Sequence, residues 1–239
     1  MSETMTVRDL IHACRSKCVS YYPLEAWLEK HGLDNPAITS WNLCPDGYTL
    51  LTLYRSTASE AEMTNDSKGL VRLAHDCTAR MLSTRTRNGN EQDNQALTTL
   101  TMVRSWLRDS STVTGPEVLQ AARAAAKPYF TSMPTYIKTV SAAAHAVDYA
   151  VDHNGDAVAS CAASATYQLL DYNSQASILS GTASATAAAA NNLVYSPAGL
   201  AASELCAQVK AQVHRYAQNS TAWSLKRVLA LVSLPKALT

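Results

Sequence analysis

Arginines are the residues of this sequence best suited to binding chemistry. They recur along a helical stretch near residues 66–82, continue after it as Arg85 and Arg87, and return on later stretches. A guanidinium group binds phosphate and carboxylate oxygens through paired hydrogen bonds, and a tyrosine ring is a flat surface on which a base can stack. The predicted ligand-binding residues are Tyr48, Arg72, His75, Arg80, Arg104 and Arg108.

A structural interpretation of the same side chains stays open. Cationic residues on helices, here including Arg123 and Lys127, commonly form solvated faces, and tyrosines commonly lie at the rim of a core. The two interpretations differ in geometry. Convergence of Arg72, Arg80 and Arg104 on one polar cavity with a tyrosine favours a ligand site, whereas scattered arginines favour a surface for protein contacts.

Catalytic motifs are missing from the sequence. It contains no Gly-x-Ser-x-Gly elbow, phosphate-binding loop, His-Glu-x-x-His pair or Gly-x-Gly-x-x-Gly turn. His75 and Asp76 are neighbours on a helical stretch, where successive side chains point about 100° apart, so we predict that they do not form a dyad. His145 and Asp148 have a spacing that predicts a hydrogen bond on a helix surface. We expect a protein that is not an enzyme.

The cysteines are scattered rather than clustered. In a reducing compartment such cysteines are free thiols that pack mostly as small apolar groups. Cys14 and Cys18 share a helix face near His12, but zinc usually takes four ligands and no second closely spaced pair exists. We therefore predict no metal site and no cofactor. The cysteines are Cys14, Cys18, Cys44, Cys77, Cys161 and Cys206.

The composition is that of a folded and nearly neutral protein. Of 239 residues, 47% are hydrophobic, enough to build a core, and 20 Lys and Arg balance 19 Asp and Glu. This balance argues against general nucleic-acid binding but permits a local basic pocket. The sequence shows neither a signal peptide nor a stretch that predicts a membrane span. We expect a cytoplasmic protein.

Helical periodicity runs through most of the chain. Leu70, Leu73, Cys77 and Met81 form one apolar stripe, and no segment shows the sustained alternation of a strand, so we predict an all-α fold. The predicted helices cover about residues 6–21, 23–31, 36–44, 48–55, 66–82 and 97–107.

Local start signals accompany these helices. Asn35-Pro36 and Ser196-Pro197 each predict an N-cap followed by proline in the first turn, and Thr114 to Glu117 predicts a capping box. His153-Asn-Gly155 and Asp171-Tyr-Asn173 predict turns.

The second half of the sequence differs from the first. Residues 6–112 contain varied helices, whereas residues 113–234 are rich in Ala, Ser and Thr, with predicted final helices over 200–216 and 223–232. Alanine favours helices and lets their backbones approach closely, which predicts a compact bundle of antiparallel helical hairpins. Because no linker separates the halves, we expect a single domain over 1–239.

Several segments follow one another in the order typical of one family. Residues 37–51 read AITSWNLCPDGYTLL and resemble a helix pair of the type W..C..GDWMLWL. Residues 70–80 resemble a helix rich in Ala and Cys that ends in arginine, and residues 95–107 resemble the helix AIE.A..W..G. Residues 118–126 and 206–216 resemble the start of a long Ala-rich region and a closing segment, CADIVR..Y. On these segments the chain resembles the Imm-5-like immunity proteins of phages and bacteria.

This resemblance implies a role in immunity or counter-defence, with two possible mechanisms. In the first, the protein binds and inhibits a partner, either a bacterial defence protein or a toxin. In the second, it is a phage sponge that sequesters a cyclic nucleotide or an NAD-derived immune signal. Both place it in the cytoplasm, that of the host cell if a phage encodes it. Its Ala-rich helix faces, with few charges, also predict a homo-oligomer, a dimer or larger.

Overall fold

The backbone of this protein is helical, as its periodicity predicts. The computed structural model describes residues 4–19, 22–83, 91–129, 133–171 and 218–239. Within these ranges the only β-type pairing is one isolated bridge between Thr6 and Pro36. The all-α prediction is confirmed. Among the described helices, none is both long and apolar enough to cross a bilayer.

In the part of the chain that the structure describes, nine helices with defined ends precede two further helical stretches. They are α1 (Val7–Ser16), α2 (Tyr22–Glu29), α3 (Ala37–Asn42), α4 (Gly47–Thr57), α5 (Glu60–Asn65), α6 (Ser67–Ser83), α7 (Glu91–Arg108), α8 (Gly115–Ala126) and α9 (Thr135–Val151). Residues 155–171 and 218–229 are also helical, and a 3-10 turn, η1 (Lys236–Leu238), lies near the C-terminus. The sequence did not predict α5. The predicted helix over 200–216, the predicted N-cap at Ser196-Pro197 and the predicted turn beyond Asp171 fall outside the described residues.

Side chains at the helix starts satisfy backbone amides that no helical carbonyl reaches. Thr6 with Asp9 and Ser59 with Glu62 form capping boxes at α1 and α5. At α8 the Glu117 carboxylate accepts hydrogen bonds from the amide and hydroxyl of Thr114, both at 2.8 Å, which confirms the predicted contact.

The start of α3 corrects one prediction. Pro36 is the N-cap of α3 and Asn35 precedes it, so proline does not lie inside the first turn. The Asn35 side-chain amide instead donates to the carbonyl oxygen of His31 at 2.6 Å. The Asn-Pro pair therefore closes the connection from α2 and does not cap the helix that follows.

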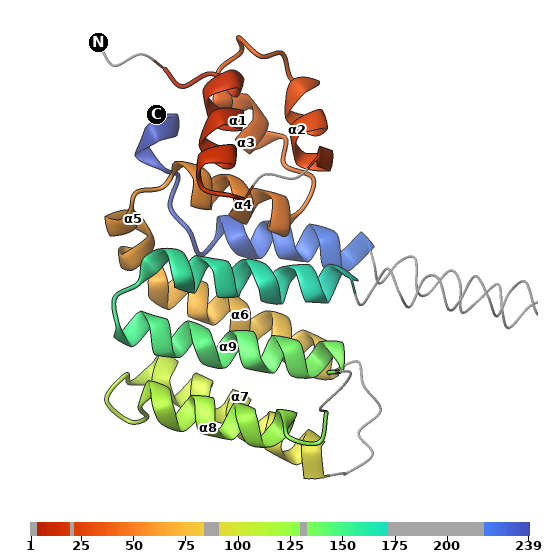
Figure 1. The fold of residues 1–239 in the computed structure, drawn as a ribbon, viewed down its shortest axis with the longest axis vertical. Helices are drawn as coiled ribbons and strands as arrows, with labels where there is room; N and C mark the ends of the chain where they lie inside the picture. The colour runs from red at the N-terminus through yellow and green to blue at the C-terminus, as the bar shows by residue number, and fades with distance from the viewer. Residues whose placement is uncertain (1–3, 20–21, 84–90, 130–132, 172–217) are drawn as a thin grey trace, which may run out of the picture.

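The helices are arranged in successive layers (Figure 1). At one end α1 contacts α2, α3 and α4; at the other, α7 and α8 pack against each other and against α9, which also contacts α6. Helices 155–171 and 218–229 lie between α4 and α9 in this view. Buried apolar side chains from all these layers form one connected core.

Alanine decides how closely the later helices pack. Residues Ala143, Ala144 and Ala146 of α9 are almost fully buried, as are Ala159, Ala162 and Ala165 of helix 155–171. Small side chains allow short interaxial distances, so the predicted antiparallel packing of Ala-rich helices is confirmed for these two.

Residues 218–239 return to the first half of the protein and form what we call the C-terminal contact. Helix 218–229 approaches the start of α4 so closely that a Cβ atom on Gly47 would lie 2.7 Å from the carbonyl carbon of Ser224. The Gly47 amide donates to the Ser224 hydroxyl at 3.1 Å. Farther along, the amides of Ser233 and Lys236 donate to carboxylates at the two ends of α5, those of Asp66 and Glu62.

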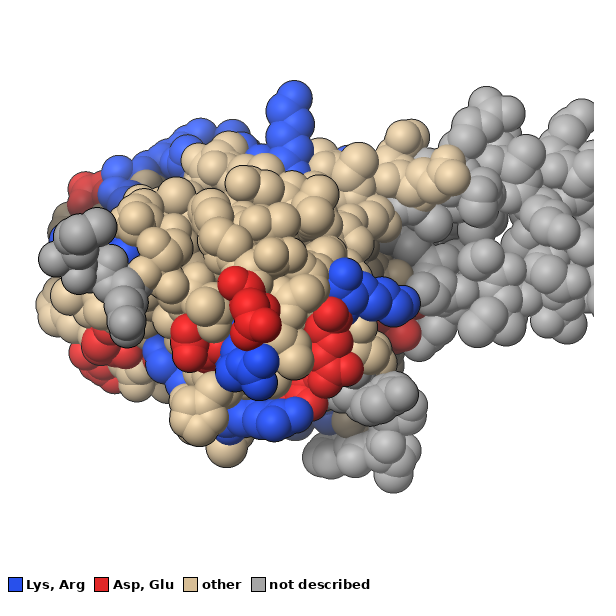
Figure 2. Space-filling model, turned by 90° about the horizontal axis from the view of Figure 1, so that it is seen from above, with Lys and Arg blue, Asp and Glu red and all other residues tan. Residues whose placement is uncertain are grey.

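Charged side chains on the outer surface are mixed in sign. Arg8 pairs with Asp34 at 3.0 Å, and Arg15 forms a two-point pair with Glu25 at 2.6 and 3.0 Å. Seen from the end of the molecule that carries α1 and α2, acidic and basic groups lie next to one another (Figure 2). This face therefore does not have the broad basic surface on which general nucleic-acid binding depends.

Candidate ligand-binding groove

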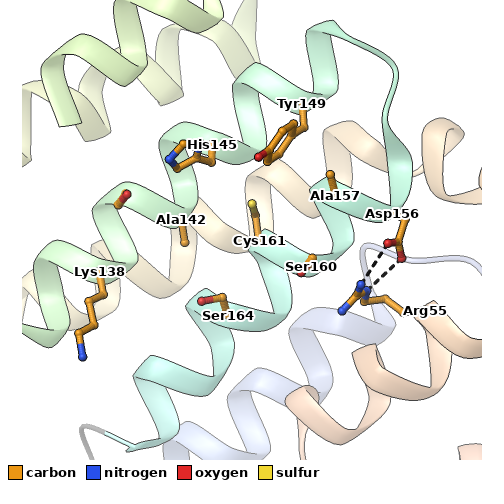
Figure 3. Close-up of a pocket in the computed structure, with 11 residues that line it drawn as sticks. Arg55, Lys138, Ala142, His145, Tyr149, Asp156, Ala157, Ser160, Cys161 and Ser164 are labelled. Carbon is orange, nitrogen blue, oxygen red and sulfur yellow. Dashed lines mark hydrogen bonds and ion pairs between the residues drawn. The ribbon is translucent and has the colours of Figure 1, made fainter. Parts of the chain in front are cut away.

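A polar cavity of about 570 Å³ lies between α9 and helix 155–171 (Figure 3). Its volume falls within the roughly 300–1,000 Å³ that small-molecule sites occupy. Each of the two helices contributes one side of the cavity. Small side chains line its bottom, and longer side chains line its edges. The lining residues are Arg55, Lys138, Ser141, Ala142, His145, Tyr149, Asp156, Ala157, Ser160, Cys161 and Ser164.

A second cavity, of about 410 Å³, lies on the other side of helix 155–171, toward α4. It shares Arg55, Ser160 and Ser164 with the first, so the two cavities adjoin. We call the combined space the groove: helix 155–171 is its floor, and α9 and α4 are its walls. The residues that line only the second cavity are Cys18, Val19, Tyr48, Thr52, Ala163 and Tyr167.

The floor helix begins at a tightly built turn. His153 has a left-handed backbone (φ +56°), and the Asn154 side chain accepts a hydrogen bond from the amide of Ala157 at 3.0 Å. Glu60 at the start of α5 accepts from the amide of Gly155 at 2.6 Å. A Cβ on Gly155 would collide with the backbone of α5, so glycine is required at this close approach. The predicted turn is confirmed, and α5 is the element that anchors it.

Arg55 joins one wall of the groove to the floor. Its Nε and Nη2 atoms donate to the two carboxylate oxygens of Asp156, each at 3.1 Å. The Arg55 side chain is 18% exposed, whereas that of Asp156 is 43% exposed. Nη1 makes no hydrogen bond or ion pair with any described residue, so its N–H groups remain as donors at the edge of both cavities.

Aromatic rings flank the groove at two places. His145 and Tyr149 of α9 are stacked, with ring centroids 5.9 Å apart, and both line the first cavity. Tyr48 of α4 and Tyr167 of the floor helix lie 5.3 Å apart and line the second. Burial, reinforced by the neighbouring Tyr167, raises the pKa of the Tyr48 hydroxyl, which therefore stays neutral.

The remaining polar groups favour binding over nucleophilic chemistry. Burial raises the pKa of the Cys161 thiol to about 11, so Cys161 is not an activated nucleophile at neutral pH. Lys138 is exposed at the groove edge and has no ion pair with a described residue. Three serine hydroxyls, those of Ser141, Ser160 and Ser164, add donors and acceptors.

Only one of the six residues predicted to bind a ligand lines the groove, namely Tyr48. Arg72, Arg104 and Arg108 are exposed on α6 and α7 and line neither cavity. Arg80 lies with its guanidinium 5.0 Å from the ring centroid of Trp223, so it contacts helix 218–229. Convergence of Arg72, Arg80 and Arg104 on one of these cavities with a tyrosine is therefore not observed.

His75 corrects the prediction that it cannot pair with Asp76. Its Nδ1 atom lies 2.9 Å from one oxygen of Asp76, and Arg227 of helix 218–229 donates to the other oxygen. Although neighbouring side chains leave a helix about 100° apart, rotation about their side-chain bonds brings the His75 ring and the Asp76 carboxylate together. Arg227 holds the carboxylate in place. Burial raises the pKa of Asp76, but the hydrogen bonds from His75 and Arg227 outweigh it, and the pKa is lowered overall.

Contacts of the described residues bear on two further predicted groupings, His145 with Asp148 and Cys14 with Cys18. Among the described residues no hydrogen bond or ion pair joins His145 to Asp148, and His145 instead stacks on Tyr149 one helical turn along. Cys14 is buried against the Ser56 hydroxyl at 3.0 Å, whereas Cys18 is exposed at the groove. Among the described residues no three His, Cys, Asp or Glu side chains are grouped as metal ligands.

Sequence reasoning missed the cations that line the groove, Arg55 and Lys138. Tyr48, Thr52 and Arg55 follow one another at spacings of four and three residues, which places all three on one face of a helix. That spacing was visible in the sequence, but Asp156, the partner of Arg55, is 101 positions away.

Comparison with known proteins gives no match: no protein-family model, no curated protein and no solved structure is significantly similar to this chain. The resemblance to Imm-5-like proteins stays a prediction, and the function has to be argued from the geometry of the groove.

Proposed function

We propose that this protein binds a small nucleotide-type ligand in the groove and holds it without changing it chemically. The observation that carries the proposal is the coexistence, in one groove, of phosphate-binding and base-stacking groups. Arg55 and Lys138 supply positive charge, the serine hydroxyls supply hydrogen bonds, and tyrosine rings border both cavities. In the setting implied by the resemblance to immunity proteins, such binding sequesters a signalling molecule.

The electrostatics of the groove support a ligand with few negative charges. Asp156 neutralises part of the charge of Arg55 but also holds the guanidinium by two hydrogen bonds, so that the Nη1 edge is pre-oriented. Lys138 adds a cation on the opposite wall. A ligand with one or two phosphates matches this charge, and a long polyanion does not.

Native mass spectrometry tests the proposal, first on the purified protein and then after addition of AMP, GMP, cyclic di-AMP or cyclic di-GMP. We expect at least one nucleotide to bind, and the double variant Arg55→Ala/Lys138→Ala to lose it. Arg72→Ala and Arg104→Ala are matched controls, since they remove exposed arginines away from the groove, and they should retain binding.

Labelling of Cys18 gives an independent measurement. This exposed thiol lines the second cavity, so a bound nucleotide should slow its reaction with a maleimide, as followed by peptide mass spectrometry. Unchanged labelling together with the absence of every tested nucleotide from the native spectra overturns the proposal. A co-purified protein in those spectra favours inhibition of a partner, the first mechanism implied by the resemblance.

A further inference from the structure

Each end of the groove has one cation and one tyrosine on opposite walls, and the walls that carry them are exchanged between the two ends. Helix α9 joins the floor helix through the short turn after Val151, so these two helices are antiparallel. The start of the floor helix, at Asp156, thus lies near the end of α9, at Tyr149, while Ser164 lies toward Lys138 near the start of α9.

The α4 wall runs antiparallel to the floor as well. Arg55, near the end of α4, contacts Asp156, and Tyr48, near its start, contacts Tyr167 farther along the floor helix. Each end of the groove therefore carries one cation and one aromatic group on opposite walls. Arg55 and Tyr149 lie toward the Asp156 end, on opposite sides of the floor helix (Figure 3), and the helix directions place Lys138 and Tyr48 toward the other end.

This arrangement is approximately two-fold. In this diagonal order a half-turn about the middle of the floor, between Asp156 and Tyr167, would bring the arginine end onto the lysine end and one tyrosine toward the other. A ligand complementary to such a site has two anionic groups and two rings in the same diagonal relation. The two ends are also well separated, because the eight-residue step from Asp156 to Ser164 spans about 12 Å of helix.

We propose that the ligand is a cyclic dinucleotide, whose two phosphates and two bases are related by a two-fold axis. One phosphate contacts the Nη1 edge of Arg55 and the other contacts the ammonium group of Lys138. One base stacks at Tyr149 and the other at Tyr48. The hydroxyls of Ser160 and Ser164 lie beneath the central ring of the ligand and form hydrogen bonds with its polar atoms. This inference rests on the proposed nucleotide-binding function and adds the ligand class.

Isothermal titration calorimetry with cyclic di-AMP and cyclic di-GMP, each compared with AMP or GMP, tests the inference. We expect one molecule of at least one cyclic dinucleotide to bind per chain, about tenfold or more tighter than the corresponding mononucleotide, because both halves of the ligand are held at once. The mononucleotide should bind at two places per chain, one at each end.

Single substitutions test the two-fold arrangement. Arg55→Ala and Lys138→Ala should each weaken cyclic dinucleotide binding about tenfold or more, the loss expected for one charge-assisted hydrogen bond. Tyr149→Ala and Tyr48→Ala should each leave only one binding place for the mononucleotide. Arg72→Ala and Arg104→Ala should bind normally, and thermal melting of every variant separates a lost contact from a lost fold.

The outcomes separate the two proposals. A mononucleotide that binds once per chain and as tightly as any cyclic dinucleotide overturns the two-fold ligand and leaves nucleotide binding standing. A substitution that matters at one end while its counterpart at the other end has no effect also overturns the two-fold ligand. Failure of all four nucleotides to bind overturns both proposals.

Discussion

Two arginine–aspartate pairs join distant parts of this chain, and their surroundings differ. In the C-terminal contact Asp76 has a partner on each oxygen, His75 on one and Arg227 on the other, and its side chain is 22% exposed. At the groove both oxygens of the more exposed Asp156 bind one guanidinium, and one edge of that guanidinium has no described partner. The first carboxylate bridges residues of two different helices, whereas the second binds a single guanidinium that lines two cavities.

This difference shows that an ion pair does not by itself indicate a function. Both pairs are formed between residues more than a hundred positions apart, and both use Nε and Nη2 of arginine. Only the neighbouring groups distinguish them, since the C-terminal contact is closed by close backbone packing and the groove is bordered by small side chains. Stability is therefore expected to depend on the C-terminal contact, and binding on the groove.

The largest expected effect is that of adding one carbon atom within the C-terminal contact. Gly47→Ala places a Cβ against the backbone of Ser224, which the packed helices can relieve only by moving apart. We expect the free energy of unfolding to fall by about 3 kcal/mol, the upper range for overpacking. Urea denaturation measures it, with Leu43→Ala as control, because Leu43 is 56% exposed. A Gly47→Ala variant as stable as the unmodified protein contradicts the close approach.

A smaller difference should separate the two aspartates. Asp76→Ala leaves Arg227 and His75 partly buried without their acceptor and should lower the free energy of unfolding by about 2 kcal/mol. Asp156→Ala removes a half-exposed carboxylate and should lower it by less than about 1 kcal/mol. Equal losses in parallel urea titrations would show that the two pairs carry the same structural weight.

The smallest expected effect is the dependence of the Asp76 contribution on pH. Because the pKa of Asp76 is lowered below its ordinary value of 3.8, its stabilisation is complete above that value and is lost as the pH falls through the folded-state pKa. The difference in free energy of unfolding between the unmodified protein and Asp76→Asn should therefore shrink as the pH falls below 3.8. Denaturation at several pH values measures this difference, and a constant difference rules out the charged contact.

The helices themselves followed from local patterns. The apolar stripe through Leu70 and Met81 lies on α6, and the Thr114–Glu117 contact was visible as a short motif, because both depend on residues a turn or two apart. Helix α5 was missed because its six residues are too short to show an apolar stripe. Its Ser59–Glu62 capping box was a signal that could have revealed it.

The candidate site was much less predictable. Residue type singled out arginines but did not distinguish Arg72, which is exposed on α6, from Arg55, which lines the groove. The rule that neighbouring helical residues point apart was wrong for His75 and Asp76, since their side chains rotate toward each other and Arg227 holds the carboxylate from another helix.

By itself, then, the sequence determined a helical protein with a large core and Ala-rich helices, because periodicity, capping and small side chains act over a few neighbouring residues. Only the tertiary structure decided which charges face a cavity. Arg55 meets Asp156 and Tyr48 meets Tyr167 across more than a hundred residues of chain. The groove exists because side chains of α9 and α4 approach helix 155–171, which contributes mostly small residues to the lining, and no local pattern specifies that neighbourhood.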